Sequence, residues 1–130
     1  MKKIIVLLLI MFFLPSSLNL FNSFAGEPTD TITAYFEALK SGDVEGIKQN
    51  IAGDFYEKNK VLLENNPDYP EFLRNFYQEA NLEIGKPVKS GNTVLIEMRT
   101  HFPDGNTGVN KLRLKEHSDG DWKIVEEIFD

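Results

Sequence analysis

Apolar residues follow one spacing in the first part of the chain and another in the last part. After the N-terminal segment they recur every three or four positions up to about residue 80, as Ile32, Tyr35, Phe36 and Leu39 do, which is typical of amphipathic helices. From residue 81 onward they alternate with polar residues, which is typical of half-buried strands. The change of period predicts a helical part followed by a sheet.

The first two helices are expected to meet at the sequence Ser41-Gly42-Asp43. Gly42 suits the left-handed position that ends a helix, and Asp43 can cap the helix that follows. Thr29 or Asp30 can cap the start of the first helix. The two helices must therefore turn sharply and pack on a common surface.

Two more helices are expected, over about 54–64 and 71–80, separated by a segment whose two prolines disfavour helix. In the first of them Asn59 falls within the apolar stripe. Its amide is expected to be either partly exposed or hydrogen-bonded, because an unpaired buried amide costs about 1–3 kcal/mol. The residues expected to face inward from the second are Phe72, Leu73, Phe76, Tyr77 and Ala80.

Four strand-like runs follow, over about 81–89, 93–102, 108–117 and 121–129. Short segments rich in Gly, Asn, Asp and Ser separate the runs, and such turns connect antiparallel neighbours. The helices can bury their apolar stripes only against the apolar face of this sheet. The predicted fold class is therefore α+β, with N-terminal helices packed on a four-stranded antiparallel sheet.

Alternation assigns each strand residue to one of the two faces of the sheet. In the second run Ile96 and Met98 are expected to face inward, whereas Glu97 and His101 face outward. In the last run the expected inward residues are Trp122, Ile124 and Ile128, against outward Lys123 and Glu127. Glu126 is the exception, because it falls on the Trp122 side, either past the edge of the core or pointing into a pocket.

The N-terminus has the pattern of a secretory signal peptide over residues 1–25. Two lysines precede eleven apolar residues, 4–14, a run well short of the ~20 that a membrane-spanning helix needs. Small Ser23 and Ala25 suit a signal peptidase, so cleavage after Ala25 is expected, leaving a single domain over 26–130. The alternative is an uncleaved N-terminal anchor. Cleavage predicts a periplasmic or secreted protein with no stable membrane anchor.

Charge and composition exclude several kinds of partner. The net charge of −6 becomes −8 when the two N-terminal lysines leave with the signal. Nucleic acid binding is not expected, because it relies on clustered Lys and Arg, which are scattered here among more numerous acids. The chain has no cysteine and two separated histidines, so we expect neither disulfides nor a zinc site. No nucleotide or Ser/His/Asp signature is present, and no cofactor is expected.

Two segments, AYFEALKSGDVEGI at 34–47 and SDGDWKIVEEI at 118–128, resemble the nuclear transport factor 2-like superfamily. Members of this cystatin-like α+β superfamily wrap helices around a curved sheet to form a cone. The likeness is strongest to small exported bacterial members, many of them lipoproteins, although this chain lacks the cysteine that a lipid anchor needs. The superfamily includes isomerases, dehydratases and purely binding modules, so the resemblance implies the fold more than an activity.

The resemblance implies a cavity between the helices and the sheet. The residues expected to line it as a ligand pocket are Tyr35, Tyr56, Asn59, Tyr77, Met98, Trp122 and Glu126. The alternative is that these aromatic side chains fill the core, since aromatic stripes at helical spacing usually pack.

Three functions remain open. The leading interpretation is an exported, non-enzymatic module that binds a small apolar ligand or a protein partner. The second is a small cofactor-free isomerase or dehydratase with an acid/base pair in the cone, as in isomerases whose apolar pocket tunes a carboxylate pKa. Asp54, Glu126 and a tyrosine such as Tyr56 are its candidate groups. The third is a structural subunit with a solid core.

The outward face of the sheet is a further candidate surface. Glu97, Arg99, Arg113 and Lys115 are expected to form charge pairs across the strands, each worth about 0.2–1 kcal/mol. Leu95 and Val125 add apolar area to the same face. The sequence is therefore compatible with a homodimer through the exposed sheet face, as in many members of the superfamily.

Overall fold

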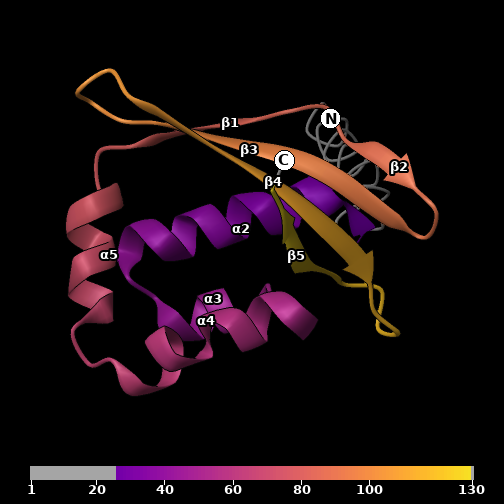
Figure 1. The fold of residues 1–130 in the computed structure, drawn as a ribbon, viewed down its shortest axis with the longest axis horizontal. Helices are drawn as coiled ribbons and strands as arrows, with labels where there is room; N and C mark the ends of the chain where they lie inside the picture. Colours follow the sequence, from indigo (N-terminus) through magenta and orange to yellow (C-terminus); the bar gives the residue numbers. More distant parts are fainter. Residues whose placement is uncertain (1–25, 130) are drawn as a thin grey trace, which may run out of the picture.

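The computed structural model describes residues 26–129, so the expected signal peptide at 1–25 lies outside the described residues. The helices are α2 (Pro28–Ser41), α3 (Val44–Gln49), α4 (Gly53–Asn65) and α5 (Tyr69–Tyr77). The strands are β1 (Asn81–Ile84), β2 (Val88–Ser90), β3 (Thr93–His101), β4 (Thr107–Glu116) and β5 (Trp122–Ile128). Helices precede an antiparallel sheet and lie on one side of it, which confirms the α+β prediction (Figure 1). Over the described range, no helix combines the length and the apolar character needed to cross a membrane.

The sheet has five strands where four were expected. Its order is β1-β3-β4-β5, and β2 also pairs with β3. The expected strand over 81–89 is interrupted at residues 85–87, because Pro87 has no N–H to donate to a neighbouring strand. The Gly85 N–H still bonds the Glu97 carbonyl at 2.8 Å. The interruption therefore divides one edge strand into β1 and β2 without detaching it from β3.

The junction between α2 and α3 has the predicted chemistry. Gly42 has φ +68°, and its N–H bonds the carbonyls of the last turn of α2. The Asp43 carboxylate accepts a hydrogen bond of 3.0 Å from the Gly46 N–H and caps α3. The expected cap of α2 is wrong. Its N-cap residue is Glu27, because Pro28 already occupies the first turn and places Thr29 and Asp30 within the helix.

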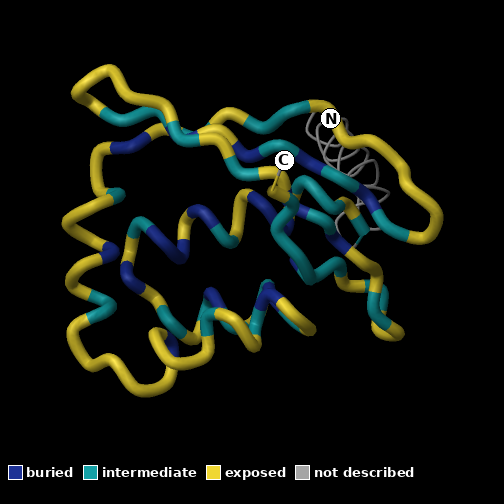
Figure 2. Tube along the Cα trace, in the orientation of Figure 1, coloured by how far each residue is buried: buried dark blue, intermediate teal, exposed yellow. Residues whose placement is uncertain are grey.

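The core lies between α2 and the inward face of the sheet. Buried residues in Figure 2 follow the inner sides of α2 and the central strands. The side chains buried most completely there are Ile32, Phe36, Leu73, Ile96, Leu112, Leu114 and Ile124. The chain after α3 also joins the sheet, since the Ala52 N–H bonds the Ile124 carbonyl and the Ile124 N–H bonds the Asn50 carbonyl, each at 2.9 Å.

A β-bulge in β5 reverses the expected alternation at the end of the chain. Arg113 pairs with Glu126 and Leu114 pairs with Ile124, so Val125 is an extra residue without a partner in β4. An extra residue moves every later side chain to the opposite face. Glu126 therefore points outward, and Glu127, opposite buried Leu112, points inward.

The bulge corrects three expectations from the sequence. Glu126 is not inward or in a pocket, because its carboxylate pairs with Arg113 on the outer face at 2.9 Å. Glu127 is not outward, and Ile128 is not inward, since Ile128 pairs with Lys111 on the outer face.

Helix α5 turns a different side to the core than expected. Leu73 is buried, but Phe72 and Phe76 are 55% and 50% exposed. The helix packs against α2 at one end of the helical layer, so a single stripe, containing Leu73 and Tyr77, is covered. The inward placement of Phe72 and Phe76 predicted from their spacing is wrong, and these rings remain on the surface.

Candidate functional site

An open groove lies between α5 and the turn that joins β3 to β4. Its volume is about 730 Å³, within the usual range for ligand sites. It is lined by Asn75 and Phe76 of α5 and by residues 102–104 and 106–108 of the turn. We call it the mouth groove.

Aromatic rings form the floor of the mouth groove. The Phe76 ring meets Phe102 edge to face, with 5.1 Å between ring centroids and 63° between planes. Phe102 reaches this position because it continues the inward alternation of β3. Gly108 lies opposite, where a Cβ atom would come no closer than 3.8 Å, to the Phe102 ring. A side chain at this position would therefore contact the Phe102 ring.

The aromatic surface continues along the exposed side of α5. The rings of Tyr69 and Phe72 stack with 6.2 Å between centroids and 11° between planes. Phe72 and Phe76 stack at 5.5 Å and 16°. These three residues occur at helical spacing, so their rings form one row that ends at the mouth groove.

Tyr77 connects the mouth groove with a polar cluster inside the cone. Its ring contacts Phe76 at 4.9 Å and Phe36 at 6.2 Å, and so lies between the groove floor and the core. On the inner face of the sheet, the Asn110 amide donates a 2.7 Å hydrogen bond to the inward Glu127 carboxylate. Tyr35 and Tyr77 lie close enough to Glu127 for its charge to act on both.

Burial raises the pKa of Tyr35 far above its ordinary value near 10, and Tyr77, Tyr69 and Glu127 add to the shift. Burial is also the main cause of the raised pKa of Tyr77. Within residues 26–129 neither the Tyr35 nor the Tyr77 hydroxyl makes a hydrogen bond. Every side-chain oxygen that is completely buried in this range does have a hydrogen-bond partner, so neither hydroxyl is completely buried. Both hydroxyls stay protonated at neutral pH, because the pKa of each is raised above its ordinary value near 10.

No protein-family model and no curated protein matches the chain. A solved structure does: a candidate NTF2-like transpeptidase from Campylobacter jejuni superposes with a TM-score of 0.50 at 13% identity, over 77% of this chain and 99% of that chain. The chain has the nuclear transport factor 2-like fold. At this identity the likeness shows the fold alone.

The nuclear transport factor 2-like cone brings together only part of the predicted pocket. Tyr35 and Tyr77 are both within reach of the Glu127 charge, as described above. Met98 is 3% exposed and belongs to the packed core, as in the alternative in which these side chains fill the cone. Trp122 lies at the opposite end of β4 from the mouth groove, since it pairs with Glu116.

The remaining predicted pocket residues lie outside the cone. The Tyr56 hydroxyl donates to Glu64 on the surface of α4, and the Asn59 amide bonds the Phe55 carbonyl of its own helix at 2.8 Å. Glu126 is on the outer face, as described above. Asp54, a candidate acid, is exposed and pairs with Lys58 at 3.4 Å. The acid/base groups considered from the sequence are therefore not in the cone.

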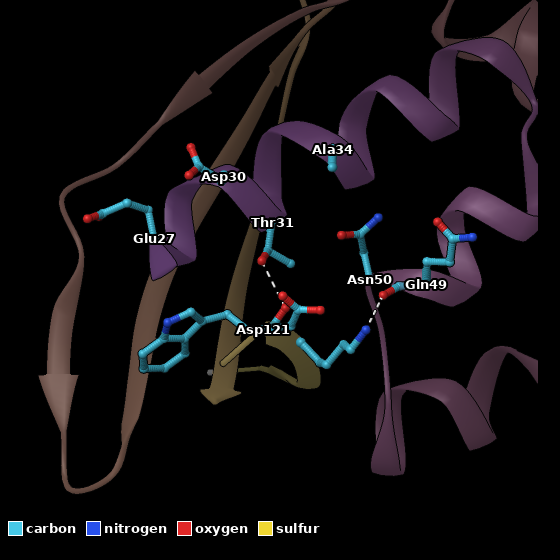
Figure 3. A pocket seen from close by; sticks show the side chains of 9 residues that line it. Glu27, Asp30, Thr31, Ala34, Gln49, Asn50 and Asp121 are labelled. Carbon is cyan, nitrogen blue, oxygen red and sulfur yellow. Dashed lines mark hydrogen bonds between the residues drawn. The ribbon is translucent and has the colours of Figure 1, made fainter. Parts of the chain in front are cut away.

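Trp122 instead borders a second hollow, of about 420 Å³, at the start of α2 (Figure 3). The carboxylates that line this hollow belong to Glu27, Asp30 and Asp121. Glu27 and Asp30 lie at the start of α2, where the positive end of the helix dipole stabilises their negative charge. The Thr31 hydroxyl donates to the Trp122 carbonyl at 2.8 Å, and the Lys123 amine to a carbonyl of α3. This hollow is thus explained as the junction that fastens α2 and α3 to β5.

Three residues that matter for the site were missed in the sequence. Asn110 had a signal, because it is a polar residue on the same alternation as Leu112 and Leu114. Phe76 was noticed but assigned to the core, and helical spacing alone does not distinguish the two sides of an aromatic-rich helix. Glu127 had no signal, because only the bulge turns it inward.

Proposed function

We propose that the protein is an exported, non-enzymatic module that binds an apolar ligand, or the apolar part of a larger one, in the mouth groove. The observation that carries this proposal is the Phe76 ring, which is half exposed over an open groove floored by Phe102. Exposed aromatic rings gathered at a concave site usually mark a binding surface. Tyr77 adds a hydroxyl donor behind this floor, which could orient a polar atom of the ligand.

A neutral fluorescent probe, N-phenyl-1-naphthylamine, tests the groove. We expect saturable fluorescence enhancement with the domain over 26–130, and its loss in Gly108→Val, whose new side chain would occupy the groove against the Phe102 ring. Phe76→Ala should weaken binding of the probe, because it removes one of the aromatic rings that the probe would contact. Phe129→Ala, which removes a more exposed phenylalanine outside the groove, is the matched control and should bind as the wild type does. Equal binding by all four proteins, or none, would contradict the proposal.

Export is the part of the proposal that rests on the N-terminal sequence. Lysines, an apolar run and small residues before Gly26 support secretion with cleavage after Ala25. Expression of the full chain in a bacterium, followed by mass spectrometry of the envelope and culture fractions, should yield a protein that starts at Gly26. A full-length product retained in the membrane would favour the uncleaved anchor instead.

For the partner, we infer a second copy of the chain bound through the outer face of the sheet. Val88, Leu95 and Ile128 line an apolar hollow of about 260 Å³ on this face, with Glu97 and Lys111 at its sides. Charges of both signs surround it, including the Arg99–Glu97 pair at 2.8 Å. Such a mixed surface is complementary to itself under two-fold symmetry, which is how most homodimers assemble.

The second candidate function is the isomerase or dehydratase, and the inward Glu127 is the observation that favours it. The Glu127 carboxylate could serve as a general base, and Tyr35 and Tyr77, on whose pKa its charge acts, could supply an oxyanion donor. The base would take a proton from carbon next to a carbonyl group, and a tyrosine would donate a hydrogen bond to the oxygen that gains charge.

Conversion of 3-cyclohexenone to 2-cyclohexenone, followed by nuclear magnetic resonance in deuterated water, tests this second function. If it holds, the wild type accelerates conversion and Glu127→Gln abolishes the acceleration. Glu126→Gln is the matched control, because the neighbouring carboxylate lies on the opposite face. A wild-type rate equal to buffer would remove this candidate. The transpeptidase name of the similar structure is not carried over, because the likeness shows the fold alone.

A further inference from the structure

The rim of the mouth groove differs chemically from its floor. Asn75 lies on the helix side, and Asp104, Asn106 and Thr107 lie on the turn side. The Asp104 carboxylate accepts bonds of 2.9 Å from the backbone and side-chain N–H groups of Asn106. These bonds use both of its oxygens once, and each carboxylate oxygen can accept again. The Asn106 amide oxygen is held beside them.

The rim offers both acceptors and donors, with Asp104 as an acceptor only. Acceptor oxygens come from Asn75, Asp104 and Asn106, and donors come from the Asn75 amide and from the Asn106 N–H that does not bond Asp104. The Thr107 hydroxyl is held at 3.0 Å from a ring nitrogen of His101. A ligand that fits this rim must both donate and accept hydrogen bonds.

The charge of the site further limits which ligands it can bind. Among the described residues that line the groove there is no Lys or Arg, Asp104 is acidic, and the whole chain has a net charge of −6. A phosphate or a carboxylate would meet the Asp104 carboxylate with no cation from these residues to compensate its charge. The ligand is expected to be neutral.

We propose that the mouth groove binds a neutral saccharide, with a sugar ring resting on Phe76 and Phe102. A pyranose has a flat face of C–H groups, which suits an aromatic floor, and hydroxyl groups around its edge, which can both donate to Asp104 and accept from the rim amides. Phe72, which stacks with Phe76 and is also exposed, gives a following sugar residue a second platform. This inference rests on the proposed binding function and names its ligand class.

A proline-rich peptide is the main competitor, because aromatic grooves also bind polyproline helices. Proline has no backbone N–H, so such a peptide presents carbonyl acceptors to its partner. The mouth groove would then place carbonyl acceptors against the Asp104 carboxylate, which can only accept. The rim chemistry favours the saccharide.

The test measures binding of cellotetraose, chitotetraose and an (Ala-Pro) repeat peptide to the domain over 26–130 by titration of amide resonances. We expect saturable shifts with at least one tetrasaccharide and none with the peptide. Affinity should fall at least tenfold in Phe76→Ala and Gly108→Val, and severalfold in Asn75→Ala, which removes a rim amide but no core contact. Phe129→Ala should bind as the wild type does.

Two outcomes would overturn the saccharide proposal and separate it from the proposed function. If the naphthylamine probe binds in the groove and neither tetrasaccharide does, or if the peptide binds instead, the groove is a binding site but its ligand is not a saccharide. If neither the probe nor any tetrasaccharide binds, both proposals fail. Circular dichroism of each variant shows whether it is folded, and Asn75→Ala keeps the test decisive where a ring substitution unfolds the chain.

Discussion

Gly42 has two separate requirements that no other residue type meets. Its φ of +68° is a conformation that side chains disfavour, and a Cβ atom there would lie 2.4 Å from the Pro70 carbonyl oxygen. The glycine that ends α2 therefore also lets α5 approach closely. Gly91 has a similar φ of +65°, but nothing lies within 4 Å of the position that its Cβ would take.

Substitution of these two glycines separates the two requirements. We expect Gly91→Ala to lower the free energy of unfolding by about 1–2 kcal/mol, the usual cost of the left-handed conformation. Gly42→Ala should lose about 1–3 kcal/mol more, because the Pro70 carbonyl must move to relieve the overlap. Urea denaturation of both variants measures the difference. An equal loss of unfolding free energy in the two variants would show that the Pro70 carbonyl can move away from residue 42 at no cost.

Tyr35 gives the protein a predicted dependence on alkaline pH. Burial raises its pKa in the folded state above that of the unfolded chain, which is near 10. The stability due to this group is therefore complete below pH 10 and is lost as the pH rises from about 10 toward the folded pKa, since the unfolded chain ionises first.

Tyr35→Phe should remove this part of the pH dependence. We expect the urea midpoint of the wild type to fall more steeply than that of Tyr35→Phe between about pH 9 and 11. Tyr69 and Tyr77, whose pKa values are also raised by burial, keep part of the slope in the variant. Parallel curves for the two proteins would mean that Tyr35 ionises in the folded state as readily as in the unfolded chain.

At the scale of elements, α5 combines a narrow buried stripe with an exposed aromatic row. Leu73 is its one fully buried side chain, at 2% exposure, while Phe72 beside it faces solvent. The helix carries the Phe76 side of the mouth groove, so the geometry of the groove depends on how α5 is anchored.

Replacement of Leu73 or of Phe72 by alanine should lower the stability of the domain by different amounts. Leu73→Ala is expected to destabilise the domain by about 2–5 kcal/mol, because it leaves a cavity under α5. Phe72→Ala should cost about 1 kcal/mol or less, since the lost contacts are ring stacking at the surface. Thermal denaturation compares them. A large loss in Phe72→Ala would indicate that the aromatic row holds the helix in place.

Some features of the helices and strands could be predicted from the sequence alone, and others could not. The switch to period two near residue 81, the turn after Ser41 and the inward residues of β3 follow from local rules, and the structure has all three. Pro87 indicated the break between β1 and β2, but the alternation of the residues around it predicted one continuous strand. No local feature of the sequence indicated the bulge at Val125, because the bulge arises from the pairing of β5 with β4 and with the chain after α3.

At the scale of the whole molecule, the two faces of the sheet have different roles in these proposals. The inner face supplies Phe102, Asn110 and Glu127 to the cone and its mouth. The outer face carries the apolar hollow around Leu95, and none of the helices α2–α5 of the described residues covers it (Figure 1). A second copy on the outer face would leave the mouth groove, which lies on the other side, open to ligand.

The domain over 26–130 should therefore dimerise with increasing concentration, and Leu95→Glu should remain monomeric. The new carboxylate would face Arg113, its partner in β4, so the monomer tolerates the change while a dimer would bury the charge. Val61→Glu on the exposed side of α4 is the control and should dimerise normally. Sedimentation velocity distinguishes the species. A wild type that stays monomeric throughout would refute the second-copy proposal.

The sequence by itself determined the order of elements, their approximate ends and the inner and outer residues of the regular strands. These depend on local backbone preferences and on periodicity, which act within a few residues along the chain. The tertiary structure alone decided which stripe of α5 is covered and which of Glu126 and Glu127 enters the cone. Both depend on contacts between segments far apart in sequence, where one extra residue or one missing neighbour moves a side chain from the core to the surface. The candidate site lies at those positions, and for that reason its residues differ from those expected.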